Sequence, residues 1–330
     1  MKLALQLFTS LTGILLLAIC VSATVTSYKV GNPADVSPQL HGQVLNLGGG
    51  GTDVDPAIQW MIDKVRGCSD CATKVDVVIL RASGADGYNA PILAMNGVDS
   101  VETHVITARK DALNQPLIAS IQNAEVIFFA GGDQCDYVQL FARTRIERAV
   151  KSVYSRGGAV GGTSAGLAVQ GENIYDGCTG SSTSTQALLN PYHSSISFTR
   201  EMFRWNDLAF TMTDSHFEQR DRMGRLFAFL ARHIGDGIGP SILGIAVNER
   251  TSVVVDQAGI ARVMGLGNGK AYFVLADHLP ETCVPGSALT YSNFKIWRVS
   301  EGGTFDLRNR PSNGFYTVSV SNGSPNINPY

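Results

Sequence analysis

The chain has 330 residues, of which 44% are hydrophobic and 16% charged, and its formal net charge is −2. A chain of this length can bury a full core and forms one or two domains. No basic excess indicates a nucleic-acid partner, and no run of like charges indicates a charged tail. The composition is that of an ordinary globular protein.

Residues 1–23 have the pattern of a secretory signal peptide. Lys2 precedes an apolar run that includes residues 11–21, and the small side chain of Ala23 suits cleavage after it. A membrane anchor is the alternative, but the apolar core is short for a span. We therefore predict a secreted, extracellular protein without membrane association after cleavage, in which residues 24–330 form a single domain.

From Ser37 the chain alternates between apolar strand patterns and helical patterns. Strands are predicted at 43–51, 75–80, 104–107, 125–134 and 157–162, and helices at 55–66 and 137–154. Continuous apolar strands separated by helices favour a parallel sheet covered on both faces. In such sheets ligands bind beyond the carboxyl ends of the strands, where the glycine turns at 48–51, 131–132 and 161–162 fall.

The second half of the chain begins with a predicted helix at 222–233. The segments 242–265 and 270–276 have strand patterns joined by hairpin turns, and residues 317–321 are a candidate edge strand. The simplest arrangement adds these strands to the same sheet.

Five cysteines remain after removal of the predicted signal peptide: Cys68, Cys71, Cys135, Cys178 and Cys283. An oxidising compartment predicts up to two disulfides and one free thiol. Cys68 and Cys71 lie in a polar connector after a helix, which favours a local disulfide over a redox or zinc site. The pairing of the other cysteines stays open.

Ser164 is a candidate nucleophile because the segment Gly162–Gly166 fits the G-x-S-x-G turn between a strand and a helix. The serine of such a turn is strained and exposed, so its neighbours must be small. The N–H of Ala165 would then point at a developing oxyanion. The alternative is a glycine-rich turn with only a packing role.

A second glycine turn, Gly131–Gln134, ends another apolar strand. The N–H of Gly132 can face the same cavity and supply a second oxyanion donor. An ordinary turn in which Asp133 caps the following helix would also satisfy these residues.

His216 is a candidate base that accepts the serine proton and returns it to the leaving amine. Three arginines follow it at the predicted start of a helix, where the helix dipole disfavours cations. They are explained if an anion binds among them, or alternatively if they form a solvated face paired with Glu218 and Asp221. The arginines are Arg220, Arg222 and Arg225.

Four motifs in order, GGGG, GGDQ, GTSAG and D-x-HFxQRxRxGRL, resemble the cyanophycinase family of serine peptidases, which is related to the aspartyl dipeptidase peptidase E. The resemblance extends from about residue 44 to about residue 269. It implies a flavodoxin-like α/β three-layer sandwich with a mostly parallel central sheet, as in class I glutamine amidotransferases. The implied activity is exopeptidase hydrolysis of β-aspartyl-arginine units of cyanophycin, a reserve polymer with a polyaspartate backbone.

The same resemblance assigns roles to individual residues. Ser164 takes the place of the nucleophile and His216 that of the base. The resemblance implies no cofactor, no metal and a peptide substrate, and it leaves open whether the protein is a homodimer. The residues that match the substrate pocket of the family are Gln134, Asp214, Arg220, Arg222 and Arg225.

Two departures from the family pattern concern the site. Ser215 stands where the family commonly has glutamine. The catalytic acid is expected in the loop after the nucleophile helix, but Thr185 and Gln186 stand where relatives tend to have an acid. Asp176 is the nearest carboxylate in that loop. Asp176 as the acid, Gln186 as a neutral orienting group and an unassisted histidine therefore remain alternatives.

Two other functions are compatible with parts of the sequence. A secreted α/β-hydrolase esterase would use the same G-x-S-x-G turn. Such enzymes usually carry an HGGG-like loop, which is not seen here, and a histidine near the end of the chain, where this sequence has His278 at a strand end. A non-catalytic binder would explain the missing acid. Labelling of Ser164 by an active-site serine probe separates the binder from both enzymes.

Overall fold

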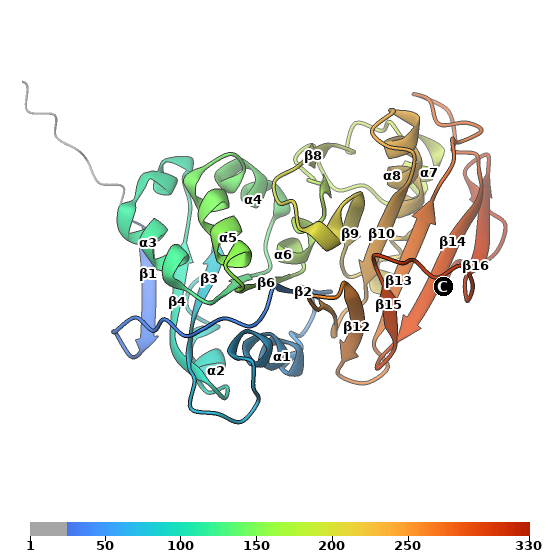
Figure 1. Cartoon of the computed structure of the whole chain (residues 1–330). Coiled ribbons are helices and arrows are strands. Elements are labelled where there is room, and N and C mark those ends of the chain that lie inside the picture. Colours follow the sequence, from blue (N-terminus) through green and yellow to red (C-terminus); the bar gives the residue numbers. More distant parts are fainter. Residues whose placement is uncertain (1–24) are drawn as a thin grey trace, which may run out of the picture.

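The computed structural model describes residues 25–330, so the predicted signal peptide lies outside the described residues. Two β-sheets with helices around them form the fold (Figure 1). The first sheet has nine strands, which in spatial order are β1 (Thr26–Gly31), β4 (Val98–Val105), β3 (Val75–Arg81), β5 (Val126–Phe129), β6 (Ala159–Thr163), β2 (Val44–Gly48), β11 (Thr251–Val255), β12 (Ile260–Gly265) and β15 (Thr304–Asp306).

The centre of the first sheet is parallel: β4, β3, β5, β6 and β2 run in one direction. Antiparallel strands flank it, β1 on one side and β11, β12 and β15 on the other. The helices that cover its two faces are α1 (Asp55–Arg66) and α2 (Asn89–Leu93) on one, and α3 (Gln115–Asn123), α4 (Gln134–Phe141) and α5 (Arg145–Ser155) on the other.

Alternation along β3 shows why its apolar run is continuous. Val77 and Ile79 belong to the core beneath α1, whereas Val78 and Leu80 belong to the core beneath α3 and α5. Successive side chains of a strand point to opposite faces, so a strand covered on both faces must be apolar throughout.

The second sheet has eight strands and is mostly antiparallel. In spatial order they are β17 (Ser324–Pro325), β16 (Tyr316–Ser321), β14 (Tyr291–Ser300), β13 (Lys270–Ala276), β10 (Ile242–Val247), β9 (Thr211–Asp214), β7 (Asn173–Tyr175) and β8 (Phe198–Arg200). Its parallel pairs are β9 with β10 and β9 with β7. Two helices, α7 (Ser184–Leu189) and α8 (Met223–Gly235), pack against this sheet.

The α/β class is confirmed, but the prediction of one mostly parallel sheet is wrong. Residues 251–265 do extend the first sheet, whereas β10 and β13 lie in the second. The turn at 248–250 is therefore a crossover between sheets and not a hairpin. Apolar alternation is the same for a strand in either sheet, so the pattern cannot assign it.

The predicted helix at 137–154 is two helices, α4 and α5. The first helix ends at Phe141, since Ala142 has a non-helical ψ of 132°, and Arg143 then adopts a positive φ of 59°. The hydroxyl of Thr144 accepts a hydrogen bond from the N–H of Ile146 and caps the second. The predicted helices at 55–66 and 222–233 are confirmed as α1 and α8.

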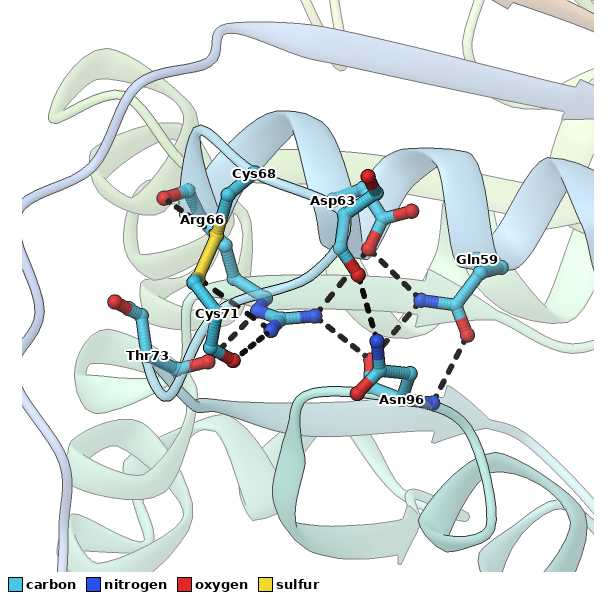
Figure 2. The surroundings of a disulfide bond; sticks show 8 residues. Gln59, Asp63, Arg66, Cys68, Cys71, Thr73 and Asn96 are labelled. Atoms are coloured by element: carbon cyan, nitrogen blue, oxygen red, sulfur yellow. Dashed lines mark hydrogen bonds and ion pairs between the residues drawn. A yellow bond between two sulfur atoms is a disulfide. The ribbon is translucent and has the colours of Figure 1, made fainter.

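Two disulfides join four of the cysteines. Cys68–Cys71 closes the connector after α1, as expected for a local disulfide (Figure 2). The buried Arg66 beside it donates to the backbone carbonyls of Cys71, Thr73 and Asn96. The second disulfide, Cys135–Cys178, ties the start of α4 to the loop after β7.

Cys283 is a buried free thiol. No helix between residues 25 and 330 combines the length and apolar character that a membrane span needs.

Candidate active site

Ser164 lies between β6 and the short helix α6 (Ala165–Ala168) and has a positive φ of 55°. Its neighbours are tightly packed. A Cβ on Gly162 would lie 2.7 Å from the carbonyl carbon of Gly166, and one on Gly166 would lie 2.8 Å from that of Phe129. The geometry confirms that this turn requires small residues, and it exposes the serine hydroxyl beyond the end of β6.

His216 follows β9, in the second sheet, and its Nε2 lies 2.7 Å from the Oγ of Ser164. The backbone N–H of His216 donates to the carbonyl of Gly49 at 2.7 Å. Gly50 lies against the imidazole ring: its φ is +90°, and a Cβ there would be 2.5 Å from Nε2. The glycines after β2 therefore leave the space that the His216 ring occupies.

Glu249 is the carboxylate that contacts the histidine: its Oε1 lies 2.6 Å from Nδ1 of His216. It follows β10, the parallel neighbour of β9, with Ala246 paired to Asp214. Because parallel strands end at the same edge of a sheet, the residues that follow them meet there. If Nδ1–H donates to Glu249, the lone pair of Nε2 faces the serine hydroxyl.

The expectation that Asp176 or Gln186 supports the histidine is wrong. Asp176 accepts hydrogen bonds from the N–H of Cys178 at 3.0 Å and from the hydroxyls of Thr199 and Ser197. Gln186 takes part in the capping box at the start of α7. Sequence reasoning missed Glu249 because the neighbouring strand order is not visible in the sequence. The available signal was an acid just after a buried strand.

The environment of His216 lowers its pKa. Burial is the largest cause, and the positive charges of Arg220 and Arg222 act in the same direction. The hydrogen bond to Glu249 and its negative charge oppose this shift. The imidazole is therefore neutral at neutral pH, which is the state that can accept a proton.

Two backbone N–H groups are candidates for an oxyanion hole. Ala165 is the first residue of α6, so its N–H has no acceptor within that helix. Gly132 lines the same small pocket as Ser164 and His216. Close by, a Cβ on Gly131 would lie 3.6 Å from the Cβ of Ser164. Gly132, one of the two predicted donors, therefore lies at the pocket that Ser164 and His216 line.

The pocket has a volume of about 70 Å³ and a largely polar lining. Gln134 lies in its wall, as expected from the sequence. The structure also brings Asp214 and all three arginines to it, together with Tyr175, which was not predicted. The lining comprises Gly132, Gln134, Ser164, Ala168, Tyr175, Thr213, Asp214, Ser215, His216, Arg220, Arg222 and Arg225.

The three arginines differ in how far they are committed to protein partners. Arg225 is buried, pairs with both carboxylate oxygens of Asp214 at 2.9 and 2.5 Å, and lies over the ring of Tyr175. Arg222 donates to the carbonyl of Ser215 at 2.8 Å, and its Nη1 lies 3.4 Å from Asp214.

Arg220 is exposed. Its guanidinium makes no ion pair or hydrogen bond with the residues that the structure describes. Glu218 instead pairs with Lys270, and Asp221 binds Tyr330. The alternative from the sequence, in which the arginines pair with Glu218 and Asp221 on a solvated face, is therefore wrong.

Taken together, a strained serine after a parallel strand, a histidine on its hydroxyl and a carboxylate on that histidine are the arrangement of a serine hydrolase. Within residues 25–330, no cluster of three or more His, Cys, Asp or Glu side chains has the grouping of a metal site.

Comparison with known proteins narrows this class. The model of peptidase family S51 matches residues 88–232. A cyanophycinase from Trichormus variabilis is 29% identical over 220 residues, which are 65% of this chain and 67% of that protein. A cyanophycinase from Synechococcus elongatus is 29% identical over 173 residues, 52% of this chain and 49% of that protein.

The crystal structure of a peptidase from an acI-B1 actinobacterium shares the fold, with a TM-score of 0.54 and 15% sequence identity. The match covers 81% of this chain and 98% of that one. The chain is thus similar to peptidase family S51 and to cyanophycinases, and these similarities support a serine-type peptidase.

Proposed function

We propose that this chain is a secreted serine peptidase that hydrolyses β-aspartyl-arginine bonds in cyanophycin or a related aspartate-rich peptide. The observation that carries the proposal is the Ser164–His216–Glu249 hydrogen-bond chain, which opens into a pocket lined by arginines. The cyanophycinase names of the relatives support the substrate class.

In the proposed mechanism, Ser164 Oγ attacks the carbonyl carbon of the scissile bond while Nε2 of His216 takes the hydroxyl proton. The N–H groups of Ala165 and Gly132 stabilise the oxyanion. The imidazolium, stabilised by Glu249, then donates its proton to the leaving amine. A water molecule repeats the sequence on the acyl-enzyme and releases the free acid and Ser164.

Specificity is proposed to come from the arginines with unused donors. A β-linked aspartyl residue at a chain end carries an α-carboxylate close to the scissile carbonyl. Arg220, whose guanidinium has no partner within residues 25–330, and Arg222, with one nitrogen engaged, can bind that carboxylate through paired hydrogen bonds. Asp214 and Arg225 hold this arrangement rather than offering free groups to the substrate.

Secretion is proposed from the predicted signal peptide and is supported by the two disulfides. Disulfides persist mainly in oxidising compartments, and four of the five cysteines that follow the predicted cleavage site are paired here.

The test is hydrolysis of a β-Asp-Arg substrate by the mature protein, compared with its α-linked isomer, with products identified by mass. We expect the β-linked substrate to be cleaved and the α-linked isomer to be poor, since it moves the carbonyl by one carbon. Ser164→Ala keeps a small residue in the turn, so the protein should fold and lose activity by several powers of ten. Equal rates on both isomers, or turnover by the alanine variant, would contradict the proposal.

The alternatives from the sequence lose their support. The non-catalytic binder rested on a missing acid, and Glu249 fills that position. The α/β-hydrolase esterase requires a histidine from near the end of the chain on the serine, but the histidine on Ser164 is His216. Labelling of Ser164 by a serine-directed probe still checks that the nucleophile is reactive.

A further inference from the structure

A second cavity, which we call the basic groove, lies beside the active site. It has a volume of about 500 Å³, within the roughly 300–1,000 Å³ range typical of ligand sites. Its polar lining is dominated by three arginines: Arg109, Arg143 and Arg200.

The arginines of the basic groove retain positive charge that the protein does not neutralise. Arg109 donates to the carbonyls of Gln139 and Ala142 at the end of α4, which fixes its position without cancelling its charge. Arg143 and Arg200 are exposed, and their guanidinium groups make no ion pair or hydrogen bond with residues 25–330.

The two acids in the groove are already paired with other cations. Glu147 binds Lys151 at 2.5 Å and accepts from the backbone N–H of Arg143. Glu201 pairs with Arg204. The net field in the groove is therefore positive, which favours carboxylates or other anions.

The groove lies directly beside the catalytic pocket. Gln134 lines the pocket and Val138 lines the groove, and both lie on α4 four residues, or about one helical turn, apart. Tyr175 lines the pocket and Phe198 lines the groove. These two residues are cross-strand partners of β7 and β8, with ring centroids 6.5 Å apart.

We infer that the basic groove binds the part of a carboxylate-rich peptide chain that extends beyond the unit being cleaved. This inference rests on the proposed function. An extended peptide substrate covers about 3.3 Å per residue. When its end unit lies in the catalytic pocket, the units that follow can therefore reach the groove. Each unit of a polyaspartate chain that carries β-linked arginine presents the α-carboxylate of that arginine, which guanidinium groups bind in pairs. The unit's own guanidinium lies at the far end of the arginine side chain and can extend into solvent. The groove therefore favours long substrates over single units.

The experiment compares an oligomer of eight such units with the single β-Asp-Arg unit. In the full chain, the double variant Arg143→Gln and Arg200→Gln removes the free charges of the groove without touching the catalytic residues. We expect the KM for the oligomer to rise about two- to thirtyfold at low salt, the range for two exposed charge pairs. The kcat, and all parameters for the single unit, should stay at wild-type values, and the difference should shrink as salt is added.

Arg148→Gln with Arg298→Gln is the matched control, because it removes the same charge from exposed arginines outside the groove. An equal rise of KM in the control would show a general charge effect and overturn the inference, as would a groove variant with an unchanged KM for the oligomer.

Binding to the Ser164→Ala background, measured by calorimetry with the same oligomer, does not depend on turnover. Weaker binding in the groove variant than in the control supports the groove even if wild type cleaves neither substrate, a result that would refute only the proposed function. Equal binding by the two double variants would refute the groove.

Discussion

Replacing Glu249 by glutamine tests the part of the site that the sequence did not reveal. The carboxylate lies 2.6 Å from Nδ1 of His216, and its side chain is 31% exposed. Glutamine keeps the size of the side chain but not its charge, so it can hold the ring only through its amide oxygen. The imidazolium that forms during acylation loses its counter-charge.

The expected magnitude follows from these contacts. The corresponding acid-to-amide change in a buried triad costs about 10⁴ in kcat. Partial exposure of Glu249 lets water screen part of its charge, so we expect a loss of about 10²–10⁴. A loss of 10³ corresponds to about 4 kcal/mol of transition-state stabilisation.

The pH dependence gives a second readout. Activity requires neutral His216 and is lost as the pH falls through its pKa. Burial and the charges of Arg220 and Arg222 already lower that pKa, and Glu249 opposes them. Without the carboxylate the pKa falls further, so the acidic limb of kcat against pH should move to lower pH while the plateau drops.

The assay is a set of pH–rate profiles on the β-Asp-Arg substrate. Glu218→Gln makes the same change two residues from His216, at an acid that contacts Asn248 and Lys270 and not the ring. It should have activity close to that of the wild type. A Glu249→Gln enzyme with a kcat near the wild-type value and an unmoved acidic limb would refute the role of Glu249.

Three further substitutions test how the site is held. Gly50→Ala should lower kcat by about 10²-fold, since its Cβ would displace the His216 ring. Because the φ of Gly50 is positive, the substitution should also lower the free energy of unfolding by roughly 1–3 kcal/mol. Wild-type kinetics in this variant would show that the position of the ring does not depend on a glycine here. Arg225→Lys should lower the free energy of unfolding by about 1–3 kcal/mol, because lysine cannot reproduce the paired contact with Asp214. Arg220→Lys should instead leave thermal unfolding unchanged and raise KM, so equal destabilisation by the two lysine variants would contradict the division of roles among the arginines.

The sequence alone determined the local parts of the site. The small residues around Ser164 follow from the steric demands of a strained turn, and the close contacts of Gly162 and Gly166 confirm them. The segment that carries His216, Arg220 and Arg222 was found because its cations crowd a helix start. Helices α1 and α8 were likewise predicted from their own periodicity, since the relevant interactions lie within a few residues of each other.

The tertiary structure decided what depends on which strands are neighbours. Glu249 reaches His216 because β10 lies parallel to β9, and the sequence does not show that order. The separation of β10 from β11 into different sheets was hidden for the same reason, since an apolar strand has one pattern in either sheet. The binding of Arg225 to Asp214 was also invisible, because charge in a sequence does not say which partner each side chain meets. Steric limits at a turn and the periodicity of a helix depend on residues that are close in sequence. Contacts between distant strands depend instead on how the whole chain packs.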